Sequence, residues 1–561
     1  MAESVKERIE RHNSILAELK KKRLPHETGW RDLSRFLLPA HGLYDSEKPG
    51  ERSPRKLESL DSRPRKNLSN FAAMMHSGHT SPARPWFKIT TEDPDLMDFA
   101  PVRDWVSFVE KLFYQAYRKS NFYASVHTGY IELAGFGVQA MLQEESWESI
   151  LHFATQTIGT YWIAQNHQGV VDTLYRKFSM TARQMAARFG KDNLSSHAKS
   201  ALDNKQDLQE FNVIHAVEPR EFYDPRKVDN SNMPFVSCYF EDGENNRELP
   251  DNFLREGGYH DFPFRVARWE TFGNEVYGTS LGLDVLPDIK QLTAVIRTQT
   301  TSIHKELDPP MALASGMKDR LNLMPGTQHP GLLNQQGEPL AKPVYSPNPN
   351  LQHGVALRQD IREAITEGFF NDLFLFLIQR PNMTATEVAE RHEEKLLLLG
   401  PAIERQQSEF FNPLADRTYG ILDRNGYIPP PPRELENKEL KVEYISLLAQ
   451  AQKQVGTQAI SSTTQFAAGL SQFWPDALDK INPDEAIDAW ADLSGSEPKM
   501  INTEQQVLEI RQTRAEQKQA AAMNEAMMNA AQAGKTMSET KINPDERTAL
   551  TDVAAAMGGA Q

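Results

Sequence analysis

A serine flanked by glycines is the first candidate for chemistry in this sequence. Gly278-Thr279-Ser280-Leu281-Gly282 fits the G-x-S-x-G pattern of a hydrolase nucleophile elbow, in which a sharp strand-to-helix turn exposes the serine hydroxyl. That motif also needs a parallel α/β sheet with later Asp and His partners, whereas the strands expected here read as antiparallel. A serine hydrolase built around Ser280 stays an alternative. The favoured interpretation is that the glycines let the chain turn from strands into a long helix.

Two glycine patterns elsewhere match nucleotide-binding motifs only in part. Asn529 to Thr536 ends in the Gly-Lys-Thr of a P-loop, but it lacks the leading glycine and follows a helical stretch rather than a strand. We therefore expect Gly534 to end a helix. The stretch from Gly135 to Ala140 resembles G-x-G-x-x-A, yet no βαβ unit is expected around it, so we interpret it as a packing or turn segment. Neither an ATPase motor nor a bound dinucleotide is supported, and we expect no cofactor.

The histidines and the single cysteine do not have the spacing of a known metal-binding motif. His76 and His79 are three residues apart and His392 lies in a charged stretch, but the sequence contains no H-E-x-x-H motif and no Cys-His set. We therefore expect no metal site and no catalytic residue, and the protein is not expected to be an enzyme. Cys238 is the only cysteine, so an intramolecular disulfide is impossible, which suits a reducing compartment.

Charge is distributed unevenly along the 561 residues. The formal net charge is -14, yet residues 1–66 hold 16 Lys and Arg against 11 Asp and Glu, so this segment carries +5 and the remainder -19. Because phosphate contacts dominate nucleic-acid binding, such an acidic body argues against a protein that grips DNA, although DNA could slide past it. No apolar run approaches the roughly 20 residues of a membrane helix, and the first residues lack the apolar stretch of a secretory signal.

The first half of the chain is expected to mix helices with antiparallel strands. Apolar periodicity predicts helices, and alternation of apolar and polar residues predicts short strands. Thr181 is expected to cap a short helix that ends at Gly190. The predicted helices cover 1–38, 67–79, 101–119 and about 122–134, and the strand regions cover about 138–178 and 211–270.

Long helices dominate the second half. Two of them, 284–307 and 355–378, flank a segment rich in proline, 308–354, which is too long for an ordinary helix connection. Pro381 then interrupts the chain, and a third long helix is expected from Thr384 to Gly426. Further helices are expected over 436–471 and 503–533, followed by a tail that is rich in small and polar residues.

The order and spacing of several stretches resemble the head-to-tail connecting (portal) proteins of short-tailed phages. The likeness runs from about residue 30 to 515, nearly the whole chain. The clip sequence and the C-terminal tail depart from the family pattern. The matching stretches are Trp30 to Pro39, Ser81 to Phe87, Ser120 to Phe122, Glu132 to Gly137, Tyr277 to Gly282, Leu286 to Ile289, Asp308 to Pro310, Met383 to Val388, Leu399 to Pro401, Glu409 to Gly426, Ser446 to Gln452 and Val507 to Arg511.

This resemblance implies an α+β, mainly helical portal fold with antiparallel β structure in a wing. It implies a wing (1–280), a first stem helix (281–308), a clip (309–354), a second stem helix (355–378), a tunnel loop (379–385), a long wing and crown helix (386–432), a crown (433–500) and a C-terminal helical or barrel-like tail (501–561). It also implies a homo-oligomeric ring, typically of twelve subunits, at one vertex of the capsid in the virion, assembled in the host cytoplasm. The ring would meet terminase, tail adaptor proteins, capsid and scaffolding proteins, and double-stranded DNA that passes through without sequence preference.

Two groups of residues are expected to act within such a ring. The kink at Pro381 would project toward the axis as a tunnel loop facing DNA, made of Gln379, Arg380, Pro381, Asn382, Met383 and Thr384. Arg380, its one cation, could contact phosphates or form a salt bridge that fixes the kink. In the clip, Lys318, Arg320 and Lys342 would supply polar contacts to terminase or adaptors.

Overall fold

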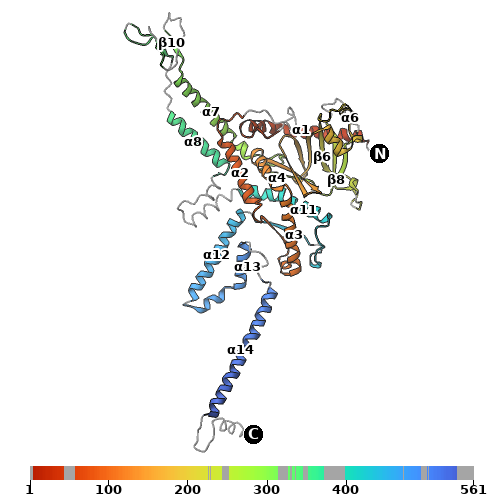
Figure 1. Cartoon of the computed structure of the whole chain (residues 1–561), viewed down its shortest axis with the longest axis vertical. Coiled ribbons are helices and arrows are strands. Elements are labelled where there is room, and N and C mark those ends of the chain that lie inside the picture. The colour runs from red at the N-terminus through yellow and green to blue at the C-terminus, as the bar shows by residue number, and fades with distance from the viewer. Residues whose placement is uncertain are drawn as a thin grey trace, which may run out of the picture. The chain divides into compact units, whose positions relative to one another are not determined.

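The computed structural model describes most of the chain between Ser4 and Glu539 (Figure 1). The described residues are 4–42, 57–224, 226–227, 229–242, 252–313, 326–328, 332–334, 336–344, 351–371, 399–436, 438–445, 447–471, 473–494, 502 and 504–539. Within these ranges no helix combines the length and the apolar character needed to cross a membrane.

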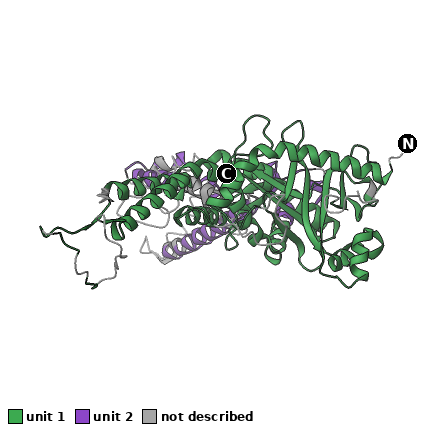
Figure 2. Ribbon diagram, turned by 90° about the horizontal axis from the view of Figure 1, so that it is seen from above, with its two compact units in different colours: residues 1–89, 107–430, 441–452 green, residues 90–106, 431–440, 453–561 purple. Residues whose placement is uncertain are grey.

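The chain divides into two compact units, shown in green and purple in Figure 2. Unit 1 comprises residues 1–89, 107–430 and 441–452, and unit 2 comprises residues 90–106, 431–440 and 453–561. The helices are α1 (Val5–Phe36), α2 (Arg63–His79), α3 (Ala100–Lys119), α4 (Phe122–Phe136), α5 (Ala182–Phe189), α6 (Ser196–Asp203), α7 (Leu281–Leu307), α8 (Leu351–Gly368), α11 (Asn412–Arg424), α12 (Leu447–Ser471), α13 (Pro483–Ser494) and α14 (Glu504–Glu539).

All the sheets are small, and those of unit 1 with three and five strands are antiparallel throughout. Their orders are β3-β2-β9 and β4-β5-β6-β7-β8, and two-stranded sheets join β1 to β12 and β10 to β11. The strands are β1 (Phe87–Thr91), β2 (Val138–Ser146), β3 (Ile150–Gln156), β4 (Tyr161–Gln165), β5 (Val171–Thr181), β6 (Glu210–Pro219), β7 (Phe235–Glu241), β8 (Arg255–Tyr259), β9 (Phe264–Arg268), β10 (Met311–Leu313), β11 (Ala341–Pro343) and β12 (Leu440–Tyr444).

Helices cover both faces of the five-stranded sheet. Apolar residues of α1, such as Leu16, pack on Ile214 and Phe240, while α5 and α6 pack on Val213 and Tyr239. Successive side chains of a strand point to opposite faces of the sheet. Val213 and Tyr239 therefore face one side and their neighbours Ile214 and Phe240 face the other, so the two helical layers lie on opposite sides of the sheet. The sheet is therefore buried as a layer inside unit 1.

The three-stranded sheet is also covered on both sides, which explains why the first six residues of β2 are all buried. One face contacts both α4, where Thr155 of β3 donates to the carbonyl of Ser125, and the helix that ends in α11, where Gln406 accepts a 2.8 Å hydrogen bond from Gln139. The other face lies against the five-stranded sheet, with the Phe264 ring 5.8 Å from that of His215. The side-chain amide of Gln143 likewise donates to Thr418 at 2.9 Å. Polar side chains thus enter this core in hydrogen-bonded pairs.

Helices α7 and α8 run antiparallel, side by side, toward the β10–β11 hairpin (Figure 1). Glycines permit the close approach at both ends of the contact, because a Cβ on Gly354 would overlap the Gln299 side chain and one on Gly368 would overlap Val285. All the buried residues of α7 lie between Leu281 and Thr293. Beyond Thr293 the two helices leave apolar side chains exposed in the single chain.

Unit 2 buries few apolar residues by itself. Phe473, Trp474 and Trp490 are exposed, and so are several apolar residues of α14, namely Leu508, Ile510, Met523, Met527 and Met528. Arg511 of α14 forms a bidentate ion pair with Asp484 at the start of α13, with N–O distances of 2.7 and 2.8 Å.

The mainly helical α+β fold predicted from the sequence is confirmed, and four local predictions are wrong. The helix expected over 355–378 is not continuous, because α8 ends at Gly368 and Phe370 has φ +53°. Residues 440–444 were expected in a helix but form strand β12, which pairs with β1 far away in sequence. Gly534 does not end a helix, because α14 continues to Glu539. The helix expected to begin at residue 67 begins at Arg63 instead. The predicted helices over 372–398 lie outside the described residues.

His79 is a buried histidine whose two ring nitrogens have no hydrogen-bond partner among the described residues. It lies against Phe411 and Tyr444, and burial lowers its pKa to about 4. The unfolded chain binds a proton near pH 6.5 and the folded chain does not, so stability falls as the pH drops from about 6.5 to about 4. Each such histidine contributes up to about 1.4 kcal/mol per pH unit.

His79→Phe is therefore expected to stabilise the protein at pH 7 by about 1–2 kcal/mol, since it removes an unsatisfied buried polar ring. It should also make the thermal midpoint less dependent on pH between 4 and 6.5. Thermal unfolding of both proteins across this range measures the two effects. An unchanged pH slope would show that His79 is already protonated, or exposed, in the folded state.

Candidate functional site

Most of the residues predicted to face DNA or partner proteins lie outside the described residues. Gln379, Arg380, Pro381, Asn382, Met383 and Thr384 lie outside the described residues, as do Lys318 and Arg320. Lys342 is described: it belongs to β11, is exposed, and its Nζ lies 3.9 Å from the Glu338 carboxylate. The β10–β11 pair therefore presents Lys342 near the tip of the α7–α8 hairpin.

Ser280 is a helix cap and not a nucleophile. Its residue is 0% exposed, its hydroxyl donates to the carbonyl of Gly135 at 2.9 Å, and it accepts the backbone N–H of Leu283 at 3.0 Å. A nucleophile elbow would present the hydroxyl to substrate beside a histidine. Within the described part of the chain, no histidine is bonded to Ser280. The hydroxyl instead fixes the start of α7 to the end of α4.

Backbone segments meet at this junction more closely than side chains would allow. Gly137 ends α4 with φ +87°, and a Cβ there would lie 2.6 Å from the carbonyl oxygen of Gly278. A Cβ on Gly278 would lie 2.6 Å from the carbonyl oxygen of Glu270, and one on Gly282 would overlap the carbonyl of Gly135. The predicted turn from strands into a long helix is confirmed, and its glycines are needed for close approach.

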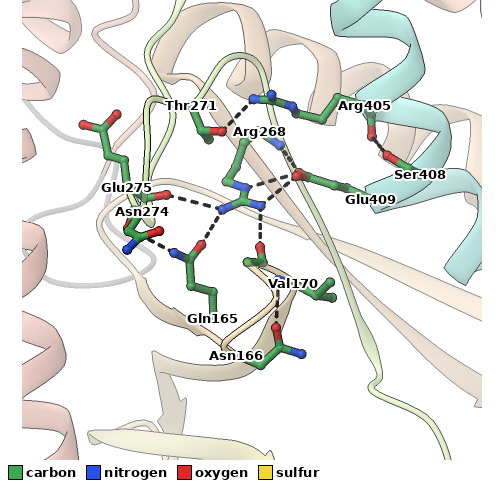
Figure 3. Close-up of polar contacts among 11 residues, drawn as sticks. Gln165, Asn166, Val170, Arg268, Thr271, Asn274, Glu275, Arg405, Ser408 and Glu409 are labelled. Carbon is green, nitrogen blue, oxygen red and sulfur yellow. Dashed lines mark hydrogen bonds and ion pairs between the residues drawn. The ribbon is translucent and has the colours of Figure 1, made fainter.

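A buried arginine connects the same junction to the helix that carries α11 (Figure 3). Arg268, at the end of β9, has a side chain only 6% exposed and forms an ion pair with Glu409 at 2.7 Å. Its guanidinium also donates to the side chain of Gln165 at 2.8 Å, and to the carbonyls of Gly169 at 2.8 Å and Glu275 at 3.5 Å. Its backbone N–H donates to Glu409 at 3.0 Å. One side chain thus holds three separate segments together.

The helix around Glu409 is locally widened into a π-turn, from Gln407 to Phe411. Pro413 follows it, and a proline cannot donate a backbone hydrogen bond and would clash with the carbonyl four residues earlier. That carbonyl belongs to Glu409, so the π-turn accommodates the proline. A second bond between the same segments joins the Arg405 guanidinium to Thr271 at 2.8 Å. Single π-turns of this kind occur often at functional sites.

A cleft of about 480 Å³ opens beside the Arg268 network, and it is lined by α1, the β4–β5 turn and the loop before α7. Its wall includes Lys22, His26 and Tyr277. The His26 ring lies 5.4 Å from the Tyr277 ring and its Nε2 is 4.0 Å from the Glu275 carboxylate. Burial lowers the pKa of His26, so the ring is neutral at neutral pH. Most of the side chains that line the cleft are polar or charged, among them Gln165, Asn166 and Glu275.

The other motif matches lead to no binding site. Gly135 to Ala140 passes from a helix into a strand, whereas a dinucleotide fingerprint passes from a strand into a helix. The Gly534-Lys535-Thr536 stretch lies within α14. His392 lies outside the described residues, and within the described ranges no cluster of three or more potential metal ligands occurs.

Arg268 and Glu409 were not predicted as a pair from the sequence, although Glu409 lies in one of the stretches that resemble the portal family. One signal was present: strand β9, Phe264-Arg265-Val266-Ala267-Arg268, places two arginines in an apolar strand, and both prove to be buried. Arginines in a buried strand require acceptors, and these are supplied by segments remote in sequence.

Comparisons with known proteins agree with this architecture. The model of the family described as bacteriophage head to tail connecting protein matches residues 10–501. The chain is 39% identical over 570 residues to the portal protein of Salmonella phage epsilon15, covering 100% of both chains. It is 36% identical over 538 residues to the probable portal protein of Bordetella phage BPP-1, covering 94% of this chain and 95% of that one. The chain therefore belongs to the bacteriophage head to tail connecting protein family, and its function is that of a phage portal protein.

Proposed function

We propose that twelve copies of the chain form a ring at one vertex of the capsid, through which double-stranded DNA enters during packaging and leaves during ejection. The observation that carries this proposal is the α7–α8 pair, two long antiparallel helices with the β10–β11 hairpin at their tip. The two helices correspond to the stem expected from the family resemblance, and the segment between them corresponds to the clip.

The outer halves of these helices expose apolar side chains that a ring would cover. Ile303, Leu307, Val355 and Leu357 are all exposed in the single chain. Apolar side chains gathered on one projecting hairpin mark a protein interface. Because each subunit of a ring contacts two neighbours through different surfaces, closure would bury both sides of every hairpin.

The charge of the chain suits a channel through which DNA moves. Twelve copies would carry a formal charge of about -168, twelve times the -14 of one chain. A wall of this sign repels phosphates, so DNA would not bind tightly at each step. The ring would be a structural conduit, and ATP hydrolysis would belong to the terminase that docks on it.

We assign the partners by region. Residues 1–280 would form the wing that meets capsid and scaffolding proteins. The clip would bind terminase during packaging and tail adaptors afterwards. Residues 379–385 would form the tunnel loop that faces DNA. Electron micrographs and mass measurement of the purified protein should show closed rings with a central hole, and a protein that stays monomeric at high concentration would refute the ring.

Shortening the clip separates ring formation from partner binding. Replacing residues 314–340 with a short Gly-Ser linker removes Lys318 and Arg320 but keeps the paired strands β10 and β11. Rings are expected to form normally, while terminase or adaptor binding in a pull-down should be lost. The control is Lys305→Ala on α7, outside the replaced segment, which should leave binding unchanged. Unaltered binding after the replacement would refute the clip assignment.

Arg380→Ala is expected to preserve ring assembly and to alter packaging efficiency or retention of packaged DNA, because one cation per subunit is lost from the channel. Arg380→Lys keeps the charge and should remain close to the unmodified protein. Both variants can be compared by the amount of nuclease-protected DNA per particle. If Arg380→Ala prevents ring formation while the subunits stay folded, Arg380 is an interface residue instead.

A further inference from the structure

The turn between β2 and β3 presents a tryptophan wholly to solvent. The two strands pair as far as Ser146 and Ile150, so Trp147, Glu148 and Ser149 form the tip of the hairpin. Trp147 is exposed at 104% of its reference area. Tryptophan is strongly enriched among the residues that anchor protein interfaces, because its large rigid ring fills a pocket at little cost in entropy.

The backbone of this tip is held in an uncommon conformation. Ile150 has φ +67°, and the N–H of Leu151 donates to the carbonyl of Ser149 at 2.7 Å. The Ser149 hydroxyl adds a 2.7 Å bond to the carbonyl of Leu151. A β-branched residue at positive φ costs on the order of 1–3 kcal/mol. These bonds hold the hairpin tip, and with it the direction in which Trp147 projects.

The cleft described above lies at the other end of the same sheet. Val138, the first residue of β2, pairs with Arg268, whose guanidinium bonds to Gln165 and Glu275 in the cleft wall. Strand β2 has nine residues, and a strand rises about 3.3 Å per residue, so roughly 30 Å separates the tip from the cleft. Trp147 therefore cannot reach the cleft of its own chain.

We propose that Trp147 of one subunit docks into this cleft of the next subunit around the ring. This inference rests on the proposed ring. A closed ring of identical subunits needs two different surfaces on each chain that complement one another, so that each subunit gives one and receives the other. Trp147 and the cleft lie at opposite ends of one sheet and would form such a pair of surfaces. The length of the sheet would then set the distance between neighbouring subunits.

The cleft is large enough for an indole, and its lining is mostly polar. An apolar cavity of about 150 Å³ accepts benzene, and this cleft measures about 480 Å³. The partly exposed ring of His26 in the cleft wall is available for an aromatic contact, whereas Tyr277 is buried beneath it. An indole N–H is a donor without acceptor capacity, and the Glu275 carboxylate in the cleft wall offers acceptor oxygens.

One pair of opposite charges lies beside the two surfaces, Glu148 at the tip and Lys22 at the cleft, and Glu275 also lies in the cleft wall. Glu148 is exposed next to Trp147, and Lys22 lines the cleft in the run Lys20-Lys21-Lys22 of α1. Two further glutamates of the hairpin, Glu144 and Glu145, lie 3.9 Å from Arg188 and 3.3 Å from Arg424 within the chain. Glu148 forms no ion pair within the described ranges. Complementary charges at the rim of a contact guide association and set its register.

Cysteine cross-linking in the assembled ring tests the contact directly. Cys238, the only native cysteine, is buried and does not compete. Glu148→Cys combined with His167→Cys keeps Trp147 in place and puts one thiol on the tip and one on the cleft wall. Mild oxidation of the ring should give a ladder of covalent multimers on a denaturing gel without reductant. The matched control combines His167→Cys with Leu208→Cys, which is exposed on the turn between α6 and β6, and it should stay monomeric.

Assembly measurements provide the second readout. Trp147→Ala should raise the protein concentration needed for half-maximal ring formation about tenfold or more. The unfolding midpoint of the subunit should not change, because Trp147 is fully exposed. Glu148→Lys and Lys22→Glu should each weaken assembly, and the two together should restore it.

The outcomes separate this inference from the ring itself. Rings that form without a covalent ladder, together with Trp147→Ala assembling at the unmodified concentration, overturn the docking and leave the proposed function standing. A disulfide within one chain, seen as a faster-migrating monomer, also overturns it. Failure of the unmodified protein to form rings overturns both.

Discussion

Glu409→Ala is expected to lower the free energy of unfolding by about 3–5 kcal/mol, the range found when one partner of a buried ion pair is removed. The variant would leave the guanidinium of Arg268, 6% exposed, without its carboxylate. The backbone N–H of Arg268 would lose its acceptor as well. Urea unfolding followed by tryptophan fluorescence measures the change.

Two further substitutions calibrate this result. Glu409→Gln keeps an acceptor oxygen but loses the charge, so its effect should be intermediate. Glu404→Ala removes an exposed carboxylate one and a half turns earlier on the same helix and should change stability by less than about 0.5 kcal/mol. If Glu409→Ala behaves like Glu404→Ala, Arg268 has found other acceptors and the ion pair does not hold the junction together.

Gly282→Ala should lower the free energy of unfolding by about 3 kcal/mol, at the upper end of the range for overpacking in a core. The added methyl group would overlap the carbonyl oxygen of Gly135 and lie 3.1 Å from Leu33. The end of α4 cannot easily move away from the added methyl group, because the Ser280 hydroxyl donates a hydrogen bond to the same Gly135 carbonyl. Since α7 starts here, we also expect a tilt of the α7–α8 hairpin and poorer ring assembly.

Thermal unfolding and electron microscopy of the Gly282→Ala protein test both parts of this prediction. Ser280→Ala should be milder, at about 1–2 kcal/mol, because it removes a cap and a hydrogen bond without a clash. Gly469→Ala, near the C-terminal end of α12, has free space for a methyl group and should stabilise its helix by up to about 1 kcal/mol. A Gly282→Ala protein as stable as the Gly469→Ala protein would mean that the junction is loosely packed.

The junction explains why a catalytic motif in this sequence carries no chemistry. Gly278 and Gly282 are needed because other backbone segments approach them closely, and Ser280 is needed because it caps α7. These three structural requirements together give the G-x-S-x-G pattern. The pattern is short enough to arise from packing alone. The burial of Ser280 decides between the two interpretations, since a nucleophile must be reached by its substrate.

Local interactions made much of the fold predictable. Apolar periodicity located α3, α4 and α7 to within a few residues, and Thr181, predicted as a helix cap, proves to be the N-cap of α5. The same local reasoning failed at β12, whose five residues pair with β1 more than 300 positions earlier. A short strand is stabilised mainly by its neighbours, so its own residues specify it weakly.

Sequence patterns alone were sufficient to indicate the fold class, the long paired helices and the family resemblance, because each depends on residues a few positions apart or on their order along the chain. They could not reveal that Arg268 is buried against Glu409, 141 residues away. Nor could they show that Trp147 and the cleft beside His26 lie at opposite ends of one sheet. Burial, close backbone approach and the distance between two surfaces depend on how remote segments pack, and packing is a property of the assembled core.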